Sequence, residues 1–195
     1  MSDVLRTYLA EKNVFLTEAQ FTRWTSAFVS KKVKKHELLL KEGDVARNTS
    51  FTKHGCLRMY TIDNKGKEHI MQFAPENWWL GDIESSSKHI PSVYFIDALE
   101  DSDLLIMDVK DWEKSINEIP PLAVLFQRLM QNRQTATQKR IIFSMSASAE
   151  ERYLDFMKTY PSLAQRIPQH MIASYLGITP ESLSRIRKQV VKSSK

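Results

Sequence analysis

Apolar residues in the first thirty positions recur at the three- and four-residue spacing of amphipathic helices. One helix is predicted around residues 4–9. A second begins after Thr17, a residue type that favours helix N-caps, and places Phe21 and Trp24 on one face. The chain therefore opens with a short helical segment.

The pattern changes between residues 33 and 107. Short β-prone runs such as CLRMYTI, HIMQFA and DLLIMDV are separated by turn sequences, among them EGD at 42–44 and DNKG at 63–66. Short strands at this spacing predict an antiparallel sandwich or roll. The lysines at 31, 32, 34 and 35 precede the first expected strand. They are interpreted as a solvated strand edge, or as a contact for DNA flanks or for an acidic partner such as RNA polymerase.

A long helix is predicted from Pro120 to about Phe143. Two interpretations stay open: an amphipathic helix packed on its own domain, or a dimerisation helix. Three shorter helices follow at 148–159, 168–176 and 180–191. The heptad-like seam of the long helix consists of Leu122, Phe126, Leu129, Arg133, Ala136, Arg140 and Phe143.

The segment 167–188, IPQHMIASYLGITPESLSRIRK, carries the most specific signal in the chain. The small Ala173 permits close approach of a second helix, and Gly177 suits a turn that needs a positive φ. Thr179 is a good N-cap and Pro180 a good first helical residue. With Leu183 pointing inward, this pattern predicts a helix-turn-helix.

The outer face of the second helix suits the major groove of DNA. Arg185 matches the two acceptors of guanine, and Glu181 matches the amino group of cytosine. The alternative is a plain helical hairpin whose charged face meets only water. The predicted DNA contacts are Gln169, His170, Thr179, Glu181, Ser182, Ser184, Arg185 and Lys188.

The positive charge of the chain is concentrated at its C-terminal end. The net charge is +5. Residues 139–195 hold ten Lys/Arg and four Asp/Glu, a net of +6, whereas residues 1–138 hold eighteen and nineteen, a net of −1. A basic end by itself indicates an anionic polymer, a membrane surface or only a solvated tail. Together with the helix-turn-helix it indicates double-stranded DNA.

The chain resembles the Crp/Fnr family of bacterial transcription regulators. The family's recognition helix reads Arg-Glu-x-x-x-Arg; here Pro180 replaces the first arginine, while Glu181 and Arg185 match. The other positions that carry the resemblance are Glu42, Gly43, Asp44, Gly55, Asp63, Gly66, Gly81, Asp82 and Arg152.

The resemblance implies an α+β fold. It consists of an N-terminal antiparallel β-roll (double-stranded β-helix or jelly roll) with flanking helices, then a long dimerisation helix, then a helix-turn-helix domain. The expected boundaries are 1–117 for a cyclic-nucleotide-binding-like sensor, 118–145 for the dimerisation helix and 146–195 for the DNA-binding domain. The implied function is that of a homodimer reading a palindromic operator.

The resemblance also places an effector pocket at Gly81, Asp82, Ser92, Val93 and Tyr94. Family members that bind cyclic nucleotides have a glutamate where Asp82 stands and a phosphate-binding arginine where Ser92 stands. Serine lacks the paired, permanently charged donors of arginine. Cyclic AMP is therefore not expected to bind. The bulky residues nearby, Phe73, Trp78, Trp79, Tyr94 and Phe95, either fill the pocket or line a site for an unknown small effector.

No resident cofactor or metal is expected. The chain has one cysteine, Cys56, whereas an iron–sulfur cluster needs several, and its scattered histidines show no haem-ligand pattern.

No catalytic residues are predicted either. A cupin-type metal enzyme shares the β-roll but needs an HxH pair, which the sequence lacks. A cyclic-nucleotide or other effector-binding signalling module without DNA reading is the remaining alternative. No apolar run approaches the roughly 18 residues of a membrane helix, and no signal peptide is visible. A cytoplasmic protein without membrane contact is expected.

Overall fold

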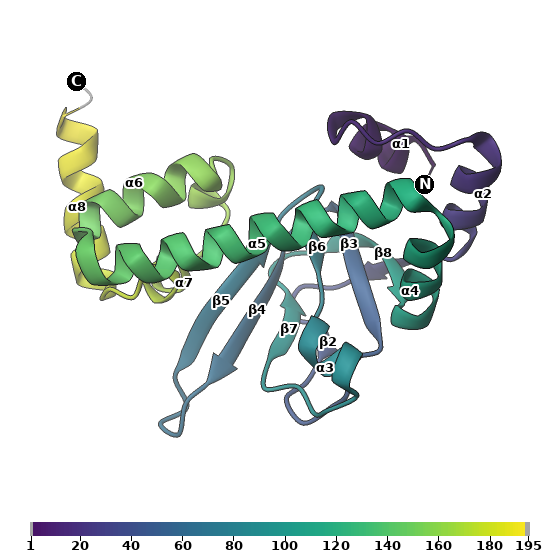
Figure 1. Cartoon of the computed structure of the whole chain (residues 1–195). Coiled ribbons are helices and arrows are strands. Elements are labelled where there is room, and N and C mark those ends of the chain that lie inside the picture. The colour runs from purple at the N-terminus through teal and green to yellow at the C-terminus, as the bar shows by residue number, and fades with distance from the viewer. Residues whose placement is uncertain (1, 194–195) are drawn as a thin grey trace. The chain divides into compact units, whose positions relative to one another are not determined.

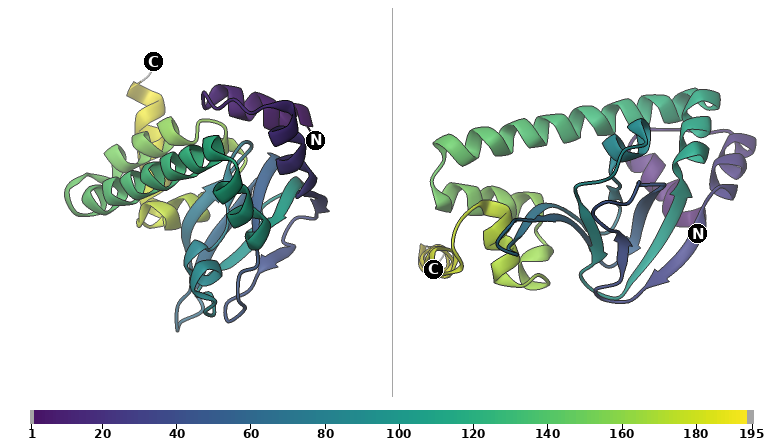
Figure 2. Two further views of the ribbon diagram at one scale, coloured as in Figure 1. Left: turned by 45° about the vertical axis from the view of Figure 1, so that its right-hand side comes forward. Right: turned by 90° about the horizontal axis from the view of Figure 1, so that it is seen from below.

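The computed structural model describes residues 2–193, which divide into two compact units. The first comprises the chain up to Thr61 together with Phe73–Asn132, and the second comprises Ile62–Gln72 together with Arg133 to the C-terminus. The second unit thus includes the tip of a β-hairpin that is far from the rest of that unit in sequence. Figures 1 and 2 label and show the elements.

Two four-stranded sheets form the roll that the turn-punctuated runs predict. One has the order β1-β8-β3-β6 and the other β2-β7-β4-β5. The registers of β1, β3 and β6–β8 with their partners are antiparallel. The strands are β1 (Val29–Val33), β2 (Leu38–Leu40), β3 (Asn48–His54), β4 (Leu57–Ile62), β5 (Glu68–Ala74), β6 (Trp79–Leu80), β7 (Phe95–Ala98) and β8 (Ser102–Asp108).

The lysine run lies partly within β1, the edge strand of the first sheet, and so not before the first strand as expected. Lys31 pairs with Glu37 at 3.0 Å, and Lys34 pairs with Asp101 at 2.7 Å. Charged side chains on an edge strand discourage pairing with a second chain. The solvated-edge interpretation therefore fits this position.

The helices are α1 (Ser2–Glu11), α2 (Glu18–Ser26), α3 (Ile83–Lys88), α4 (Val109–Glu118), α5 (Pro120–Ser146), α6 (Ala149–Thr159), α7 (Gln169–Leu176) and α8 (Pro180–Ser193), with a 3-10 turn at Leu163–Gln165. Thr17 caps α2 as expected, because its side chain accepts from the Gln20 amide while Gln20 bonds back to the Thr17 amide. The sequence reading missed α4, which Asp108 caps.

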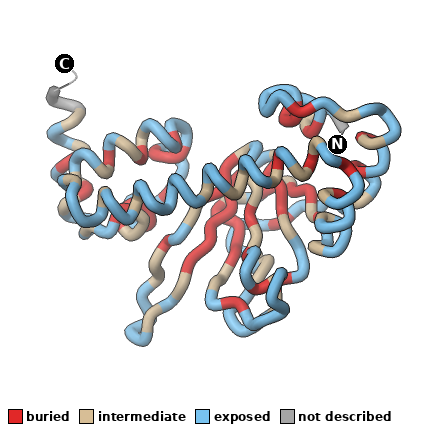
Figure 3. Tube along the Cα trace, in the orientation of Figure 1, coloured by how far each residue is buried: buried red, intermediate tan, exposed pale blue. Residues whose placement is uncertain are grey.

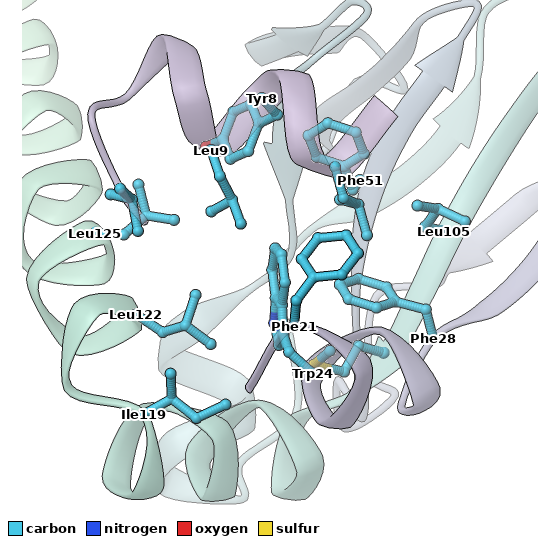
Figure 4. Packing of buried hydrophobic residues seen from close by; sticks show 13 residues of the cluster. Tyr8, Leu9, Phe21, Trp24, Phe28, Phe51, Leu105, Ile119, Leu122 and Leu125 are labelled. Atoms are coloured by element: carbon cyan, nitrogen blue, oxygen red, sulfur yellow. The ribbon is translucent and has the colours of Figure 1, made fainter. Parts of the chain in front are cut away.

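Helices α1, α2, α4 and the start of α5 cover the outer face of the first sheet (Figure 4). Trp24 and Leu5 are fully buried there, and Phe51 of β3 packs edge-on against Tyr8 at 5.0 Å between ring centroids. A second buried cluster, which includes Leu57 and Leu104, lies between the sheets. The roll thus has two apolar layers, one on each face of β3 and β8.

At its beginning the predicted seam of the long helix packs on its own domain, which is the first of the two interpretations. Leu122 is buried in the helix-covered core, Leu129 packs against that core, and Phe126 meets Trp112. These side chains pack against residues of the same chain and are not free to contact a second copy. Along the 27 residues of α5 only Leu122 and Leu125 are buried, and most of the helix is exposed (Figure 3).

Candidate nucleic-acid interface

Helices α7 and α8 meet at a tight turn built from the predicted signals. Gly177 has φ 66°, in the left-handed region where a residue without Cβ is favoured, and its amide donates to the Ser174 carbonyl at 3.1 Å. Two residues later the Thr179 hydroxyl accepts from the Ser182 amide at 3.2 Å and so caps α8. The turn therefore ends one helix and starts the next within three residues.

Buried side chains hold this helix pair against α6. Leu183 and Ile186 of α8 and Ile172 and Ala173 of α7 are buried, and the three helices contact one another. The Arg152 guanidinium donates to the Leu176 carbonyl at 2.9 Å, which satisfies an unpaired carbonyl at the end of α7. This packing fixes which face of α8 points outward.

The outward face of α8 is exposed and hollowed. Glu181, Arg185 and Lys188 are exposed, while Ser184 is half-buried. With Pro180 and Gln189 these residues line a shallow, open depression along the helix. Among the described residues neither Arg185 nor Lys188 has an ion-pair partner. Two cations on one helical face are therefore available to an anionic partner.

The carboxylate of Glu181 is held at the start of the helix. Hydrogen bonds from its own backbone amide and from the Thr179 hydroxyl keep the pKa of Glu181 below its usual value. The side chain therefore carries a full negative charge at neutral pH and accepts hydrogen bonds only. That is the property needed to accept from a cytosine amino group.

The other predicted contacts divide into two groups. Gln169 and His170, at the start of α7, are exposed, and so is Thr179. Ser182 instead is half-buried and lies 3.2 Å from the Thr179 hydroxyl, which makes it a capping partner. The side chains of residues 191–195 lie outside the described part of the chain.

The hairpin tip Ile62–Gln72 of the second unit contacts α7. The sequence analysis did not predict this contact. The Ser174 hydroxyl donates to the Glu68 carbonyl at 3.0 Å and accepts from the Ile70 amide at 3.1 Å. Arg140 of α5 donates to the carbonyls of Met71 and Ile70 at 2.6 and 3.0 Å. A serine and an arginine so far from the hairpin in sequence carry no local signal of this contact.

The residues predicted for the effector pocket bond to one another. The Ser92 hydroxyl donates to Asp82 Oδ2 at 2.7 Å, and the Tyr94 amide donates to the Ser92 hydroxyl at 3.0 Å. The second Asp82 oxygen caps α3 by accepting from the Ser85 amide at 3.2 Å. Asp82 and Ser92 are 6% and 3% exposed.

The remaining members of the predicted pocket add no ligand-binding group. Gly81 lies so close to β3 that a Cβ atom there would come within 3.2 Å of the Thr49 hydroxyl. Val93 is 59% exposed, and Tyr94 packs against the cluster between the sheets. The arrangement offers no cationic side chain for a cyclic phosphate, so these residues do not fit a cyclic nucleotide.

The five bulky residues near this site pack in separate places. Phe73 is fully buried, and Trp78 lies against the cluster between the sheets. Trp79 lies on the helix-covered side, where its indole N–H donates to the Tyr8 hydroxyl at 3.0 Å. Phe95 stacks on Tyr60 with ring centroids 5.3 Å apart. These rings fill the protein interior and do not enclose a common site.

Within residues 2–193 there is no group of three His, Cys, Asp or Glu side chains placed to hold a metal ion. Cys56 is buried. No helix in this part of the chain is both long and apolar enough to cross a membrane.

Three sequences or sequence profiles and one solved structure are similar to this chain. Residues 30–118 match the sequence profile described as cyclic nucleotide-binding domain. The chain is 27% identical over 191 residues to the regulatory protein HlyX of Actinobacillus pleuropneumoniae, covering 91% of this chain and 78% of HlyX. It is 28% identical over 177 residues to the fumarate and nitrate reduction regulatory protein of Escherichia coli strain K12, covering 84% and 69%.

A solved structure from Eubacterium rectale, titled as a transcriptional regulator assigned to the crp/fnr family, superposes with a TM-score of 0.68. The sequence identity is 22%, and the match covers 95% of this chain and 88% of that one. The predicted architecture of β-roll, long helix and terminal helix pair is thus found in a known fold.

Proposed function

We propose that this chain is a transcription regulator of the Crp/Fnr type, like the regulators it resembles, and that it binds a palindromic DNA operator as a homodimer without cyclic AMP. The relatives it matches are regulators, and we propose a DNA-binding protein with no catalytic role, acting in the cytoplasm with RNA polymerase as a further partner.

The exposed face of α8 carries the proposal. Arg185 and Lys188 stand on it without ion-pair partners in the described chain, and Glu181 is fully ionised. In our proposal Arg185 reads one guanine and Glu181 one cytosine in each half-site. Lys188, Gln169 and His170 contact phosphates, which position the protein without specifying sequence.

A solvent-exposed seam on α5 supports the dimer. Seven exposed residues recur at alternating spacings of four and three: Val124, Arg128, Gln131, Thr135, Gln138, Ile142 and Met145. This spacing keeps them on one face of a helix in a two-stranded coiled coil. Met145 and Ile142 are 83% and 60% exposed, and apolar side chains left this open favour burial by a second copy.

Two copies paired in this way present two α8 helices. Reading helices of such dimers enter successive major grooves about 34 Å apart, so we expect half-sites roughly ten base pairs apart from centre to centre. The polar middle of the seam predicts a dimer of moderate stability that dissociates on dilution.

The closed arrangement of Asp82 and Ser92 supports independence from cyclic AMP. A cyclic phosphate at this position would have to break the 2.7 Å bond between these side chains without gaining a cationic partner. The runner-up function, an effector-binding module without DNA reading, would leave the free cations of α8 without a role.

The test is selection of bound duplexes from a random DNA pool by the purified protein at low salt, without added ligand. The proposal predicts an enriched palindrome with half-sites about ten base pairs apart. An Arg185→Ala variant run in parallel is expected to lose the preference at one base pair per half-site. Failure of the unmodified protein to enrich any sequence would refute the proposal.

A further inference from the structure

A hollow of about 410 Å³ lies between the two sheets of the roll, within the first unit. This volume is in the range of pockets that bind small molecules, roughly 300–1,000 Å³. Its lining comes from both sheets and from the loop between β2 and β3: Lys31, Leu38, Leu39, Leu40, Asp44, Val45, Ala46, Arg47, Asn48, Ser50, Leu80, Ile96 and Ile106.

The floor and walls of this hollow are aliphatic. Leu80 and Ile96 are buried at 2% and 4% exposure, whereas Leu39, Leu40 and Ile106 keep part of their surface open. Apolar surface that faces a water-accessible hollow is stabilised when an apolar group displaces that water. The interior of the hollow therefore favours a hydrocarbon or aromatic group.

Ser50 places one hydroxyl in this apolar setting. It stands opposite Leu80 of β6 and Ile106 of β8 in the sheet registers, and its neighbour Phe51 faces the other, helix-covered side. Ser50 is 6% exposed, and its hydroxyl lines the hollow without a hydrogen bond to any of the described residues, so it is open to water there. Water in the hollow can bond to this hydroxyl in the free protein, and a ligand group that bonds to it would take the place of that water.

The mouth of the hollow carries charges of both signs. Lys31 is paired with Glu37. Asp44 and Arg47, three residues apart in the same loop, form no ion pair within the described chain. A ligand with one negative and one positive group can satisfy both, whereas a simple acid would meet the Asp44 carboxylate as well as the Arg47 guanidinium.

This hollow adjoins the predicted effector pocket, because the Asp44 carbonyl accepts from the Ser92 amide at 2.9 Å, but the two have different linings. Gly81, Asp82, Ser92, Val93 and Tyr94 do not line it. Because Asp82 and Ser92 bond to each other, their closed site and the open hollow are two different features of the same roll.

We propose that the hollow binds a free apolar α-amino acid, and phenylalanine serves as its probe. The side chain occupies the aliphatic interior. The α-carboxylate pairs with Arg47, whose planar guanidinium matches a carboxylate in two-point contact, and the α-ammonium pairs with Asp44. This site does not depend on DNA reading, and its test needs no DNA.

The probe is phenylalanine, titrated calorimetrically into the full-length protein. Three analogues each lack one recognised feature: 3-phenylpropanoate lacks the ammonium, phenylalaninamide lacks the carboxylate, and alanine lacks the aromatic group. The proposal predicts that each binds at least tenfold more weakly than phenylalanine. If 3-phenylpropanoate binds as tightly as phenylalanine, the Asp44 contact and the amino-acid assignment are wrong.

Variants distinguish binding in the hollow from non-specific binding elsewhere on the protein. Arg47→Gln and Asp44→Asn are each expected to weaken phenylalanine at least tenfold, because each removes one charge partner. Lys53→Gln on β3, which does not line the hollow, is the matched control and is expected to bind normally. Ser50→Leu fills the hollow and is expected to abolish binding.

Leu38→Trp provides a second block if Ser50→Leu fails to fold, because Leu38 stands at the mouth and is 49% exposed. A folded blocking variant that still binds phenylalanine with unchanged affinity would overturn the proposal. So would the absence of detectable binding to the unmodified protein at millimolar phenylalanine.

Discussion

The polar groups of the closed site at Asp82 bond to one another, whereas charged groups on the outer face of α8 have no such partners. At the first, two buried side chains and two backbone amides satisfy one another within a few residues of α3. At the second, Arg185 and Lys188 stand exposed without protein partners in the described chain. Polar groups that satisfy each other stabilise a fold, whereas charges left unpaired in a fixed array are available for recognition.

The largest expected effect is on stability and comes from Asp82→Ala. This change leaves the buried Ser92 hydroxyl and the Ser85 amide without their acceptor, at a cost of about 2–4 kcal/mol in the free energy of unfolding. Chemical denaturation measures it. Ser92→Ala, which removes the donor but leaves the cap of α3, is the matched control and is expected to cost less. Equal stability of Asp82→Ala and the unmodified protein would show that the site is not held by these bonds.

Arg185→Ala is expected to alter DNA recognition and to leave the stability of the protein unchanged. Stability stays unchanged because the side chain is exposed, while discrimination at one guanine per half-site falls by about 1–3 kcal/mol. Competition binding with operators altered at single base pairs measures the loss. An unchanged base preference in this variant would contradict the role of Arg185 as a base reader.

A smaller effect is expected from Ser174→Ala, which tests the contact between α7 and the hairpin tip Ile62–Gln72. The change removes both hydrogen bonds to the hairpin backbone and costs about 1 kcal/mol locally. Hydrogen exchange of the Ile70 amide should become several-fold faster. Ser174→Thr retains the hydroxyl and is expected to restore protection; unaltered exchange in Ser174→Ala would show that the hairpin does not depend on this contact.

The smallest expected effect belongs to Lys188→Ala. If Lys188 contacts a phosphate, its loss weakens binding almost uniformly across sequences and lowers the slope of log affinity against log salt by about 1. Titrations at four salt concentrations measure the slope. A changed base preference with an unchanged slope would instead assign Lys188 to base reading.

Local signals were sufficient where the structure is local. Gly177, Thr179 and Pro180 lie within four residues of one another and define the turn between α7 and α8 without help from distant contacts. The alternation of β-prone runs and turns likewise predicted a roll. Strand β1 was missed because its sequence, VSKKV, is an edge strand rich in lysine and lacks a clear apolar alternation.

Features that depend on tertiary contacts could not be read from the chain. The heptad pattern of α5 identified a helix, but whether Leu122 or Val124 faces outward depends on α1 and α2 packing against one side. The bond between Asp82 and Ser92 joins residues ten positions apart across a helix and a loop. The sequence could show that the phosphate-binding arginine was absent, but not that serine would bond to Asp82 in its place.

The most direct test of the contrast between the closed site and the open face is the affinity of the protein for its selected operator duplex with and without millimolar cyclic AMP, measured by fluorescence anisotropy at fixed salt. The account predicts tight, sequence-dependent binding in the absence of cyclic AMP and the same dissociation constant in its presence. A dissociation constant that falls tenfold or more on addition of cyclic AMP would contradict it, because the site formed by Asp82 and Ser92 would then have opened to bind the nucleotide.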